Sequence, residues 1–306
     1  MTQEGTNPSP AEYQYTVLDI LSRSDDDITI LVRDQEGNNA ICMAYSIKKL
    51  EENHIYPQFV EKLNKLKEIN HKNIPKIYSV QAYGDYIYIF CERVPNATLK
   101  EYVLSNGKMP TQHIVSIMNQ LLSALQCAHS KGVAHNHITL DNIMFDRDMV
   151  PVLYNFHLGM KDFFSAVKTP KNDVNFCSPE EIQEDSIDQY AADIWHLGIV
   201  IYVLCTSKYP FSNTNHSKLC QTILSDEPDY DSIDPKIVVK LKKMLEKDPA
   251  KRATAANLIE GEQITDIKTI YFNPIKKIIP KLLHVHELKR IESIIKGNSV
   301  PFRTNT

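Results

Sequence analysis

The sequence lacks paired cysteines, long apolar runs and an excess of basic residues. Its six cysteines stand singly with no C-x-x-C pair, which is typical of reduced thiols rather than of a disulfide framework. The longest apolar run, residues 194–205, is too short to cross a bilayer, and residues 1–10 show no signal-peptide pattern. The formal net charge of −4 predicts no general attraction to nucleic acid. These absences predict a soluble protein of the cytoplasm, with the nucleus left open.

Strand patterns come first along the chain, and helical patterns follow from about Pro95. A polar segment, residues 1–13, is predicted to be a disordered tail. Alternating and β-branched runs then predict strands over residues 15–21, 28–32, 41–48, 77–82 and 86–92. Apolar residues at three- and four-residue steps predict helices over residues 57–69, 99–106 and 114–130.

The stretch from His135 to Met144 reads HNHITLDNIM and follows a helical run that ends near Gly132. The sequence YNFH, at residues 154–157, comes a short distance later. This layout resembles the catalytic loop of protein kinases, H-R-D-L-x-x-x-N, and the D-F-G motif that follows it.

Three later motifs extend the resemblance to about residue 262. Residues 178–180, SPE, stand for the kinase A-P-E motif, and residues 193–198, DIWHLG, match the family's D-x-W-x-x-G helix. Residues 248–252, DPAKR, resemble the segment whose Arg pairs with the A-P-E Glu. Within the family, the sequence most resembles calcium/calmodulin-dependent and related serine/threonine kinases.

The resemblance implies an α+β fold with a small β-rich lobe and a larger helical lobe. The kinase-like domain is placed at residues 14–263, with the N-terminal lobe over 14–93 and the C-terminal lobe over 94–263. The resemblance also implies structural roles for two groups of residues. Leu66, His135 and Phe156 are expected to form part of a hydrophobic column between the lobes. Glu180, Asp193 and Arg252 are expected to brace the larger lobe through buried polar contacts.

The catalytic positions of the family are altered in this chain. His137 stands where the kinase base, an Asp, belongs, and Thr139 replaces the phosphate-neutralising Lys. Asn155 replaces the Asp that holds magnesium, while Asn142 is retained at the second metal position. A neutral amide is a poor ligand for a hard dication, so we expect no metal to bind and none of these residues to be catalytic. His137 has a pKa suited to a base, but without metal it is expected to be structural.

The phosphate-binding positions are altered as well. Residues 21–29 replace the glycine-rich loop without any glycine, and Asp25 to Asp27 place three carboxylates where the triphosphate would lie. Lys48, in Tyr45-Ser46-Ile47-Lys48, resembles the phosphate-pairing lysine of V-A-I-K. Its helix partner, a Glu, falls on Lys62 by an ungapped count. Glu61 is one residue away and rotated by about 100°, although a one-residue gap would restore it.

The adenine pocket is expected to be lined by Thr29, Ser46 and Met144, with Cys91 as gatekeeper. Two hydroxyl groups in an otherwise apolar slot weaken stacking without forbidding it. No cofactor is expected, and ATP, with or without Mg²⁺, is expected to bind weakly at best. Asn136 replaces the Arg that reads activation-loop phosphorylation in many kinases, and the phosphorylation of Ser165 or Thr169 is left open.

Residues 264–306 form a basic extension. From Thr265 onward there are eight Lys or Arg against three acidic residues. Apolar residues recur there at helical steps between Pro280 and Gly297, which are plausible helix ends. The recurring residues are Leu282, Val285, Leu288, Ile291 and Ile295. Such a basic amphipathic helix favours a calmodulin-like or acidic partner, and packing on the chain's own domain is an equal alternative.

Three hypotheses for the function follow from these residues. The leading one is a pseudokinase that acts as a scaffold or allosteric regulator of signalling proteins, such as an active kinase or its substrate. The first alternative is a divergent serine/threonine kinase that uses Lys48, Asn142, Asn155 and His137. The second is a nucleotide-sensing switch that binds ATP without metal and transfers nothing.

Overall fold

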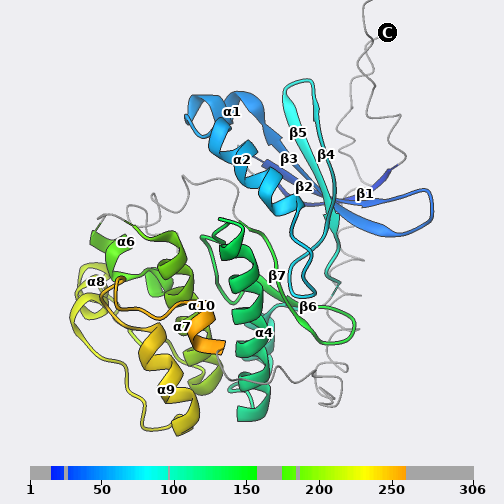
Figure 1. Cartoon of the computed structure of the whole chain (residues 1–306). Coiled ribbons are helices and arrows are strands. Elements are labelled where there is room, and N and C mark those ends of the chain that lie inside the picture. The colour runs from blue at the N-terminus through cyan, green and yellow to red at the C-terminus, as the bar shows by residue number, and fades with distance from the viewer. Residues whose placement is uncertain (1–14, 24–26, 96, 157–173, 184–186, 260–306) are drawn as a thin grey trace, which may run out of the picture. The chain divides into compact units, whose positions relative to one another are not determined.

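A computed structural model describes residues 15–23, 27–95, 97–156, 174–183 and 187–259. These residues form a smaller lobe built on a β-sheet and a larger lobe built of helices (Figure 1), which confirms the predicted two-lobed α+β fold. The predictions for the two tails, 1–13 and 264–306, lie outside the described residues, as do Asp25, Ser165 and Thr169.

The smaller lobe contains a five-stranded antiparallel sheet with strand order β1-β2-β3-β5-β4. Its strands are β1 (Thr16–Arg23), β2 (Asp27–Arg33), β3 (Asn39–Ser46), β4 (Ile77–Tyr83) and β5 (Tyr86–Glu92). Because side chains alternate between the two faces of a strand, the sheet has two apolar faces. One face gathers Leu31, Ile41 and Cys91, and the other gathers Ile30, Cys42 and Phe90 with their neighbours.

The third strand ends earlier than the prediction of 41–48. Its last residue is Ser46, and helix α1 (Ile47–Glu52) begins at the next position. The Ser46 side chain accepts a hydrogen bond from the backbone N–H of Lys49 at 3.4 Å, so it caps the helix. The prediction was therefore wrong for residues 47 and 48, which are helical.

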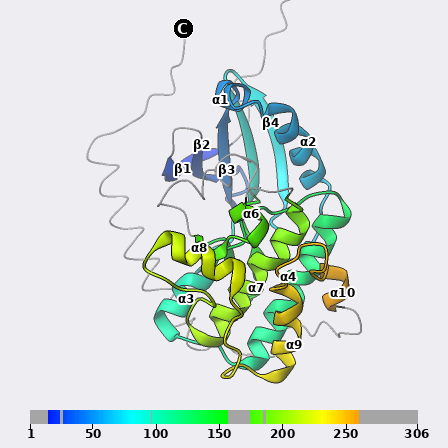
Figure 2. The ribbon, with the colours of Figure 1, turned by 90° about the vertical axis from the view of Figure 1, so that its left-hand side faces the viewer.

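Helix α2 (Tyr56–Lys67) lies beside the sheet (Figures 1 and 2) and corresponds to the predicted helix over 57–69. Phe59, Leu63 and Leu66 are buried on one face, as the spacing predicts. The Phe59 ring meets the Tyr45 ring of β3 edge to face, with centroids 5.0 Å apart. Helix α2 is thus packed on the face of β3 that carries Ile41 and Tyr45.

The larger lobe follows the strands in sequence. Its elements are α3 (Leu99–Asn106), α4 (Thr111–Ser130), β6 (Ile143–Phe145), β7 (Pro151–Leu153), the 3-10 turn η2 (Val174–Phe176), α6 (Pro179–Gln183), α7 (Gln189–Thr206), α8 (His216–Ser225), α9 (Pro235–Met244) and α10 (Ala255–Ile259). Side-chain hydrogen bonds cap the N-termini of several of these helices. Thr98 and Glu101 form a capping box at α3, and Asp188 accepts two backbone N–H groups at α7.

Helix α7 is the centre of the larger lobe and is buried from Ala191 to Cys205. Gly198 allows this close packing, because a Cβ at that position would lie 2.8 Å from Leu245 Cδ2 and 3.1 Å from Met244 Cβ. The glycine of the D-x-W-x-x-G motif is therefore needed where α7 meets the end of α9. Within the described part of the chain, no helix has the length and apolar character to span a membrane.

Candidate functional site

The loop between α4 and β6 is held by a carboxylate from α7. Asp193 accepts hydrogen bonds from the backbone N–H groups of His135 at 2.7 Å and Asn136 at 2.8 Å, and from His129 Nε2 at 3.0 Å. Burial acts to raise the pKa of Asp193, but the His129 hydrogen bond and the nearby histidines lower it on balance. The predicted bracing role of Asp193 is confirmed by these contacts.

His135 is fully buried and uses both ring nitrogens in its neutral form. Nε2 donates to the carbonyl of Tyr154 at 3.1 Å, and Nδ1 accepts from the backbone N–H of His137 at 3.2 Å. Burial lowers the pKa of His135 to about 3. Its ring also packs on Phe156, with centroids 4.5 Å apart, so two members of the predicted hydrophobic column are in contact.

The two positions that bind metal in the family carry amides that bond to each other. Asn155 Nδ2 donates to Asn142 Oδ1 at 3.4 Å, and Asn142 Nδ2 donates to the carbonyl of His137 at 2.9 Å. Asn155 adopts a positive φ of 64°, a conformation that Asn tolerates better than most residues. In the described ranges, no three His, Cys, Asp or Glu side chains are grouped to hold a metal ion.

These residues do not fit a magnesium site, because Mg²⁺ in kinases is held by a carboxylate as well as an amide. Two neutral amides supply no negative charge, and the oxygen of Asn142 already accepts a hydrogen bond. Beside them, Thr139 is buried and His137 is partly buried. The catalytic loop thus brings His137, Thr139 and Asn142 together as predicted, but it presents no cation and no carboxylate at these positions.

Lys48 does not lie where the prediction placed it. Its side chain projects from α1 with 79% exposure and pairs with Glu52 at 3.8 Å. The prediction that Ser46 lines the adenine pocket was also wrong. Ser46 caps α1, and by strand alternation it lies on the face opposite Ile41 and Met43. The run of Lys and Glu after Ser46 was the available signal, because an N-cap residue followed by i,i+4 Lys–Glu spacing is typical of a short helix.

Met43 lies on β3, on the strand face that also carries Ile41. It packs with Ile41 and Cys91 on the face of the sheet that also meets Tyr154, the residue before Asn155. Thr29 lies opposite Met43 in the β2–β3 register. The eight residues of β3 include no lysine, and Met43 places a thioether on this apolar face.

Of the other predicted pocket residues, Cys91 is 3% exposed and burial raises the pKa of its thiol to about 12. Met144 lies on β6, partly buried, and bridges to Thr98. Cys91 shares the apolar face of the sheet with Tyr154. Adenine binding by these side chains stays a prediction.

Lys62, not Glu61, is on the inner face of α2. It shares that face with Phe59 and Leu66 by helical spacing. Glu61 is 67% exposed and pairs with Lys65 at 2.6 Å. Burial lowers the pKa of Lys62 to about 8, against the opposing effect of the Asp193 carboxylate. Of these two residues, Lys62 is therefore the one on the face of α2 that carries the buried residues.

A buried ion pair joins the end of the A-P-E motif to the C-terminal part of the larger lobe. Arg252 donates Nη1 to Glu180 Oε1 at 2.6 Å and Nη2 to Glu180 Oε2 at 2.9 Å, and the two side chains are 0% and 4% exposed. This confirms the predicted pair. The sequence analysis missed a second buried contact nearby, between His196 Nε2 and Glu181 Oε2 at 2.9 Å.

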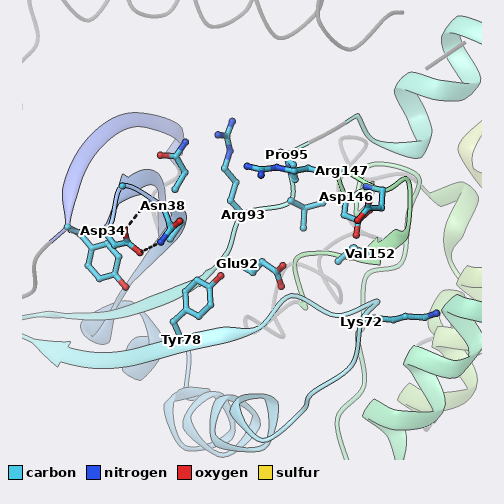
Figure 3. Close-up of a pocket in the computed structure, with 16 residues that line it drawn as sticks. Asp34, Asn38, Lys72, Tyr78, Glu92, Arg93, Pro95, Asp146, Arg147 and Val152 are labelled. Atoms are coloured by element: carbon cyan, nitrogen blue, oxygen red, sulfur yellow. Dashed lines mark hydrogen bonds between the residues drawn. The ribbon is translucent and has the colours of Figure 1, made fainter. Parts of the chain in front are cut away.

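A separate cavity of about 640 Å³ lies beside the link between the lobes (Figure 3). Acidic and basic side chains are interspersed around it, among them Asp34, Glu92, Arg93 and Arg147. It also borders Ala40, which belongs to the sheet face away from Met43 and Tyr154. None of the predicted nucleotide-binding residues lines this cavity.

Residues 30–263 match a family model described as Protein kinase domain. CBL-interacting serine/threonine-protein kinase 17 of Arabidopsis thaliana is 27% identical over 215 residues, which cover 66% of this chain and 48% of the relative. Serine/threonine-protein kinase SIK1 of Rattus norvegicus is 29% identical over 223 residues, or 70% of this chain and 28% of the relative. Calcium-dependent protein kinase 6 of Plasmodium berghei is 28% identical over 270 residues, which cover 85% of this chain and 17% of the relative. The chain spans less than half the length of these relatives.

Among solved structures, the crystal structure of Rad53 1-466 in complex with AMP-PNP is similar to this chain. The TM-score is 0.69 at 20% sequence identity, and the match covers 82% of this chain and 66% of that chain. At this level of identity the similarity shows the fold alone.

Proposed function

Because this chain belongs to the protein kinase family, we propose that it is a pseudokinase. It keeps the kinase fold without phosphoryl transfer and acts as a scaffold or allosteric regulator for signalling proteins. An active kinase or the substrate of one is the partner that this role implies. The proposal concerns the residues matched to the family, which include both lobes.

One observation carries the proposal: the hydrogen bond between Asn155 and Asn142, at the two positions where the family binds metal. Phosphoryl transfer depends on positioning and on electrostatic stabilisation of the phosphates by metal ions. An amide pair supplies no negative charge for a hard dication, and one of its two oxygens already accepts a hydrogen bond. These two positions therefore provide no electrostatic stabilisation for the transferred phosphate.

Two further positions support it. Thr139 is 6% exposed and uncharged, so it does not neutralise a transferred phosphate. The family's phosphate-pairing lysine lies on a strand of the smaller lobe, and β3 carries no lysine. A base at His137 would act without metal, without the loop cation and without the strand lysine.

The direct test is phosphotransfer from radiolabelled ATP to a generic protein substrate and to the chain itself, in Mg²⁺ and in Mn²⁺. We expect the wild type to stay at the background set by Asn155→Ala and His137→Ala. A clear wild-type signal that disappears in His137→Ala would overturn the proposal.

A regulatory role also predicts how the cell responds to variants. Cells that depend on this protein should be rescued by His137→Ala and Asn155→Ala as well as by the wild type, because neither residue is used for chemistry. Failure of both variants to rescue, at equal protein levels, would contradict the regulatory role.

A divergent serine/threonine kinase is the second candidate, and the names of the relatives favour it. This candidate predicts ATP-dependent transfer by the wild type. Since Lys48 is exposed on α1, Lys48→Ala is not the variant that tests it. Lys62→Met is the appropriate one, because Lys62 falls on the family's helix glutamate position by the ungapped count and interacts electrostatically with Asp193.

A further inference from the structure

The cavity beside the link between the lobes has two sides of different charge. Its volume of about 640 Å³ is within the range of ligand pockets, roughly 300–1,000 Å³. In the view of Figure 3, Arg93 and Arg147 lie along its upper side. Asp34, Tyr78 and Glu92 lie to the left of these arginines or below them. The cavity is therefore lined by a basic side and by an acidic, aromatic side.

Two tyrosine rings line the acidic side. Tyr78 is 47% exposed, and it is an extra residue of β4 because the register against β5 shifts between Ile77 and Ser79. Such a bulge changes the direction of a side chain. Tyr15 is held by stacking on Phe90, with ring centroids 4.5 Å apart. Both tyrosines line the cavity, so the fold brings two aromatic side chains to one place.

Two carboxylates accompany these rings. Burial raises the pKa of both tyrosines, and the Asp34 carboxylate raises both further, as the Glu92 carboxylate does for Tyr78. An ionised carboxylate offers about four acceptor sites, more than the two that Asn38 occupies on Asp34. An ammonium or guanidinium group on this side therefore meets aromatic rings and carboxylates together, and both attract cations.

Two guanidinium groups form the basic side. Arg147 is exposed in the turn between β6 and β7, and Arg93 belongs to the link that follows β5. Guanidinium groups bind carboxylates through two parallel hydrogen bonds. The cavity also has an apolar lining, which includes the buried Val94 and Val152. A ligand that fits the whole cavity carries a positive and a negative group joined by a short apolar part.

We propose that this cavity binds a peptide segment of a partner protein in which a basic side chain lies a few residues from an acidic one. The basic side chain contacts Tyr15, Tyr78 and the carboxylates, and the acidic side chain contacts Arg147. The inference deepens the proposed function and rests on it, because a scaffold needs a site that holds its partner. A ligand with charge of only one sign would leave one side of the cavity facing a like charge.

The experiment measures the fluorescence anisotropy of labelled, alanine-rich peptides that are mixed with the full chain. Each peptide carries one Arg and one Glu, separated by one to four residues, and its neutral counterpart carries Gln at both positions. We expect saturable binding at one or more of these spacings. The neutral counterpart should bind at least tenfold more weakly, and added salt should weaken the binding of the charged peptide.

Variants on the two sides test the assignment. Tyr78→Ala and Arg147→Glu should each weaken binding of the charged peptide at least tenfold. The control for the first is Tyr83→Ala, which removes an exposed tyrosine of the same strand that does not line the cavity. The control for the second is Lys236→Glu, at an exposed position in the first turn of α9. Both controls should bind as the wild type does.

An exchange of charges distinguishes a contact from a structural role. Arg147→Glu should recover binding when the Glu of the peptide is replaced by Lys, because opposite charges then face each other again. The wild type should bind this altered peptide at least tenfold more weakly than the original one. A variant that had lost its fold would bind neither peptide, and circular dichroism checks each variant.

Equal binding of charged and neutral peptides, no binding, or binding that Tyr78→Ala and Arg147→Glu leave unchanged would each overturn the inference. A dimer of the chain that Arg147→Glu dissociates in analytical ultracentrifugation would also overturn it, because a second copy would then fill the cavity. Should Tyr78→Ala fail to fold, the exchange of charges at Arg147 decides alone. Phosphoryl transfer by the wild type would overturn the pseudokinase assignment, whereas absence of peptide binding would overturn only the role of the cavity.

Discussion

In the larger lobe, Arg252 and Glu180 form a two-point ion pair that is almost wholly buried, and Asp193 holds three N–H donors. In the loops that resemble the kinase catalytic and metal-binding motifs, positions that carry charge in kinases hold Thr139 and Asn155. The first region keeps the charged groups of the family, and the second has exchanged them for neutral ones. Both regions belong to the same kinase-like fold.

The difference is explained by what each substitution leaves behind. Removing one partner of a buried ion pair leaves an uncompensated charge away from water, which is strongly destabilising. Replacing a metal-binding carboxylate by an amide removes a charge and lets Asn155 bond to Asn142. The fold therefore depends on the buried charges of the larger lobe, whereas the cleft changes its chemistry at little cost to stability.

The largest effect should come from breaking the buried pair. Arg252→Ala leaves the Glu180 carboxylate buried without its partner, and we expect the free energy of unfolding to fall by about 3–5 kcal/mol. Urea denaturation followed by circular dichroism measures it. The control is Lys251→Ala, whose exposed side chain forms a surface pair with Asp248; an equal loss there would contradict the comparison.

Asp193→Asn should have the next largest effect. The amide keeps one acceptor oxygen for three N–H donors, so the loop at His135 and Asn136 loses charge-assisted hydrogen bonds. A loss of about 2–3 kcal/mol in the free energy of unfolding is expected. Hydrogen exchange at those two amides should rise with it. Unchanged protection would show that the carboxylate does not hold the loop.

The pH dependence of stability should reveal His135. Its pKa is about 3 in the folded chain because it is buried and near 6.5 when unfolded, so the unfolded state binds the proton first. Stability contributed by neutral His135 is complete above pH 6.5 and is lost as pH falls toward 3. Between pH 7 and pH 5 the loss should be about 2 kcal/mol. His135→Phe should show a correspondingly smaller fall, and an identical profile would contradict burial of a neutral ring.

The smallest effect is expected from Lys48→Ala. The side chain is 79% exposed and its pair with Glu52 is a surface contact at 3.8 Å, which contributes little. The denaturation midpoint should therefore match the wild type. A clearly lowered midpoint in Lys48→Ala would contradict the assignment of this pair to the surface.

Sequence patterns were sufficient wherever one local rule acted alone. The helical spacing of Phe59, Leu63 and Leu66 predicted their shared buried face, and the motif around Asp193 predicted a brace that the hydrogen bonds confirm. The end of β3 was missed because two local rules competed there. The strand pattern continued through Ile47, but the Ser46 side chain caps a helix and ends the strand.

By itself, the sequence determined the two-lobed kinase-like fold and the loss of the family's charged residues at His137, Thr139 and Asn155, since these follow from residue identity and motif order. Only the tertiary structure showed that Asn155 bonds to Asn142 and how the side chains of α1 and α2 are directed. The cap at Ser46 turns Lys48 outward on α1, and the packing of Phe59 on Tyr45 turns Lys62 inward. The direction of a side chain depends on where an element ends and on what it packs against. The Ser46 cap is a local contact, but the packing of Phe59 on Tyr45 joins two separate elements, which the pattern of either element alone does not reveal.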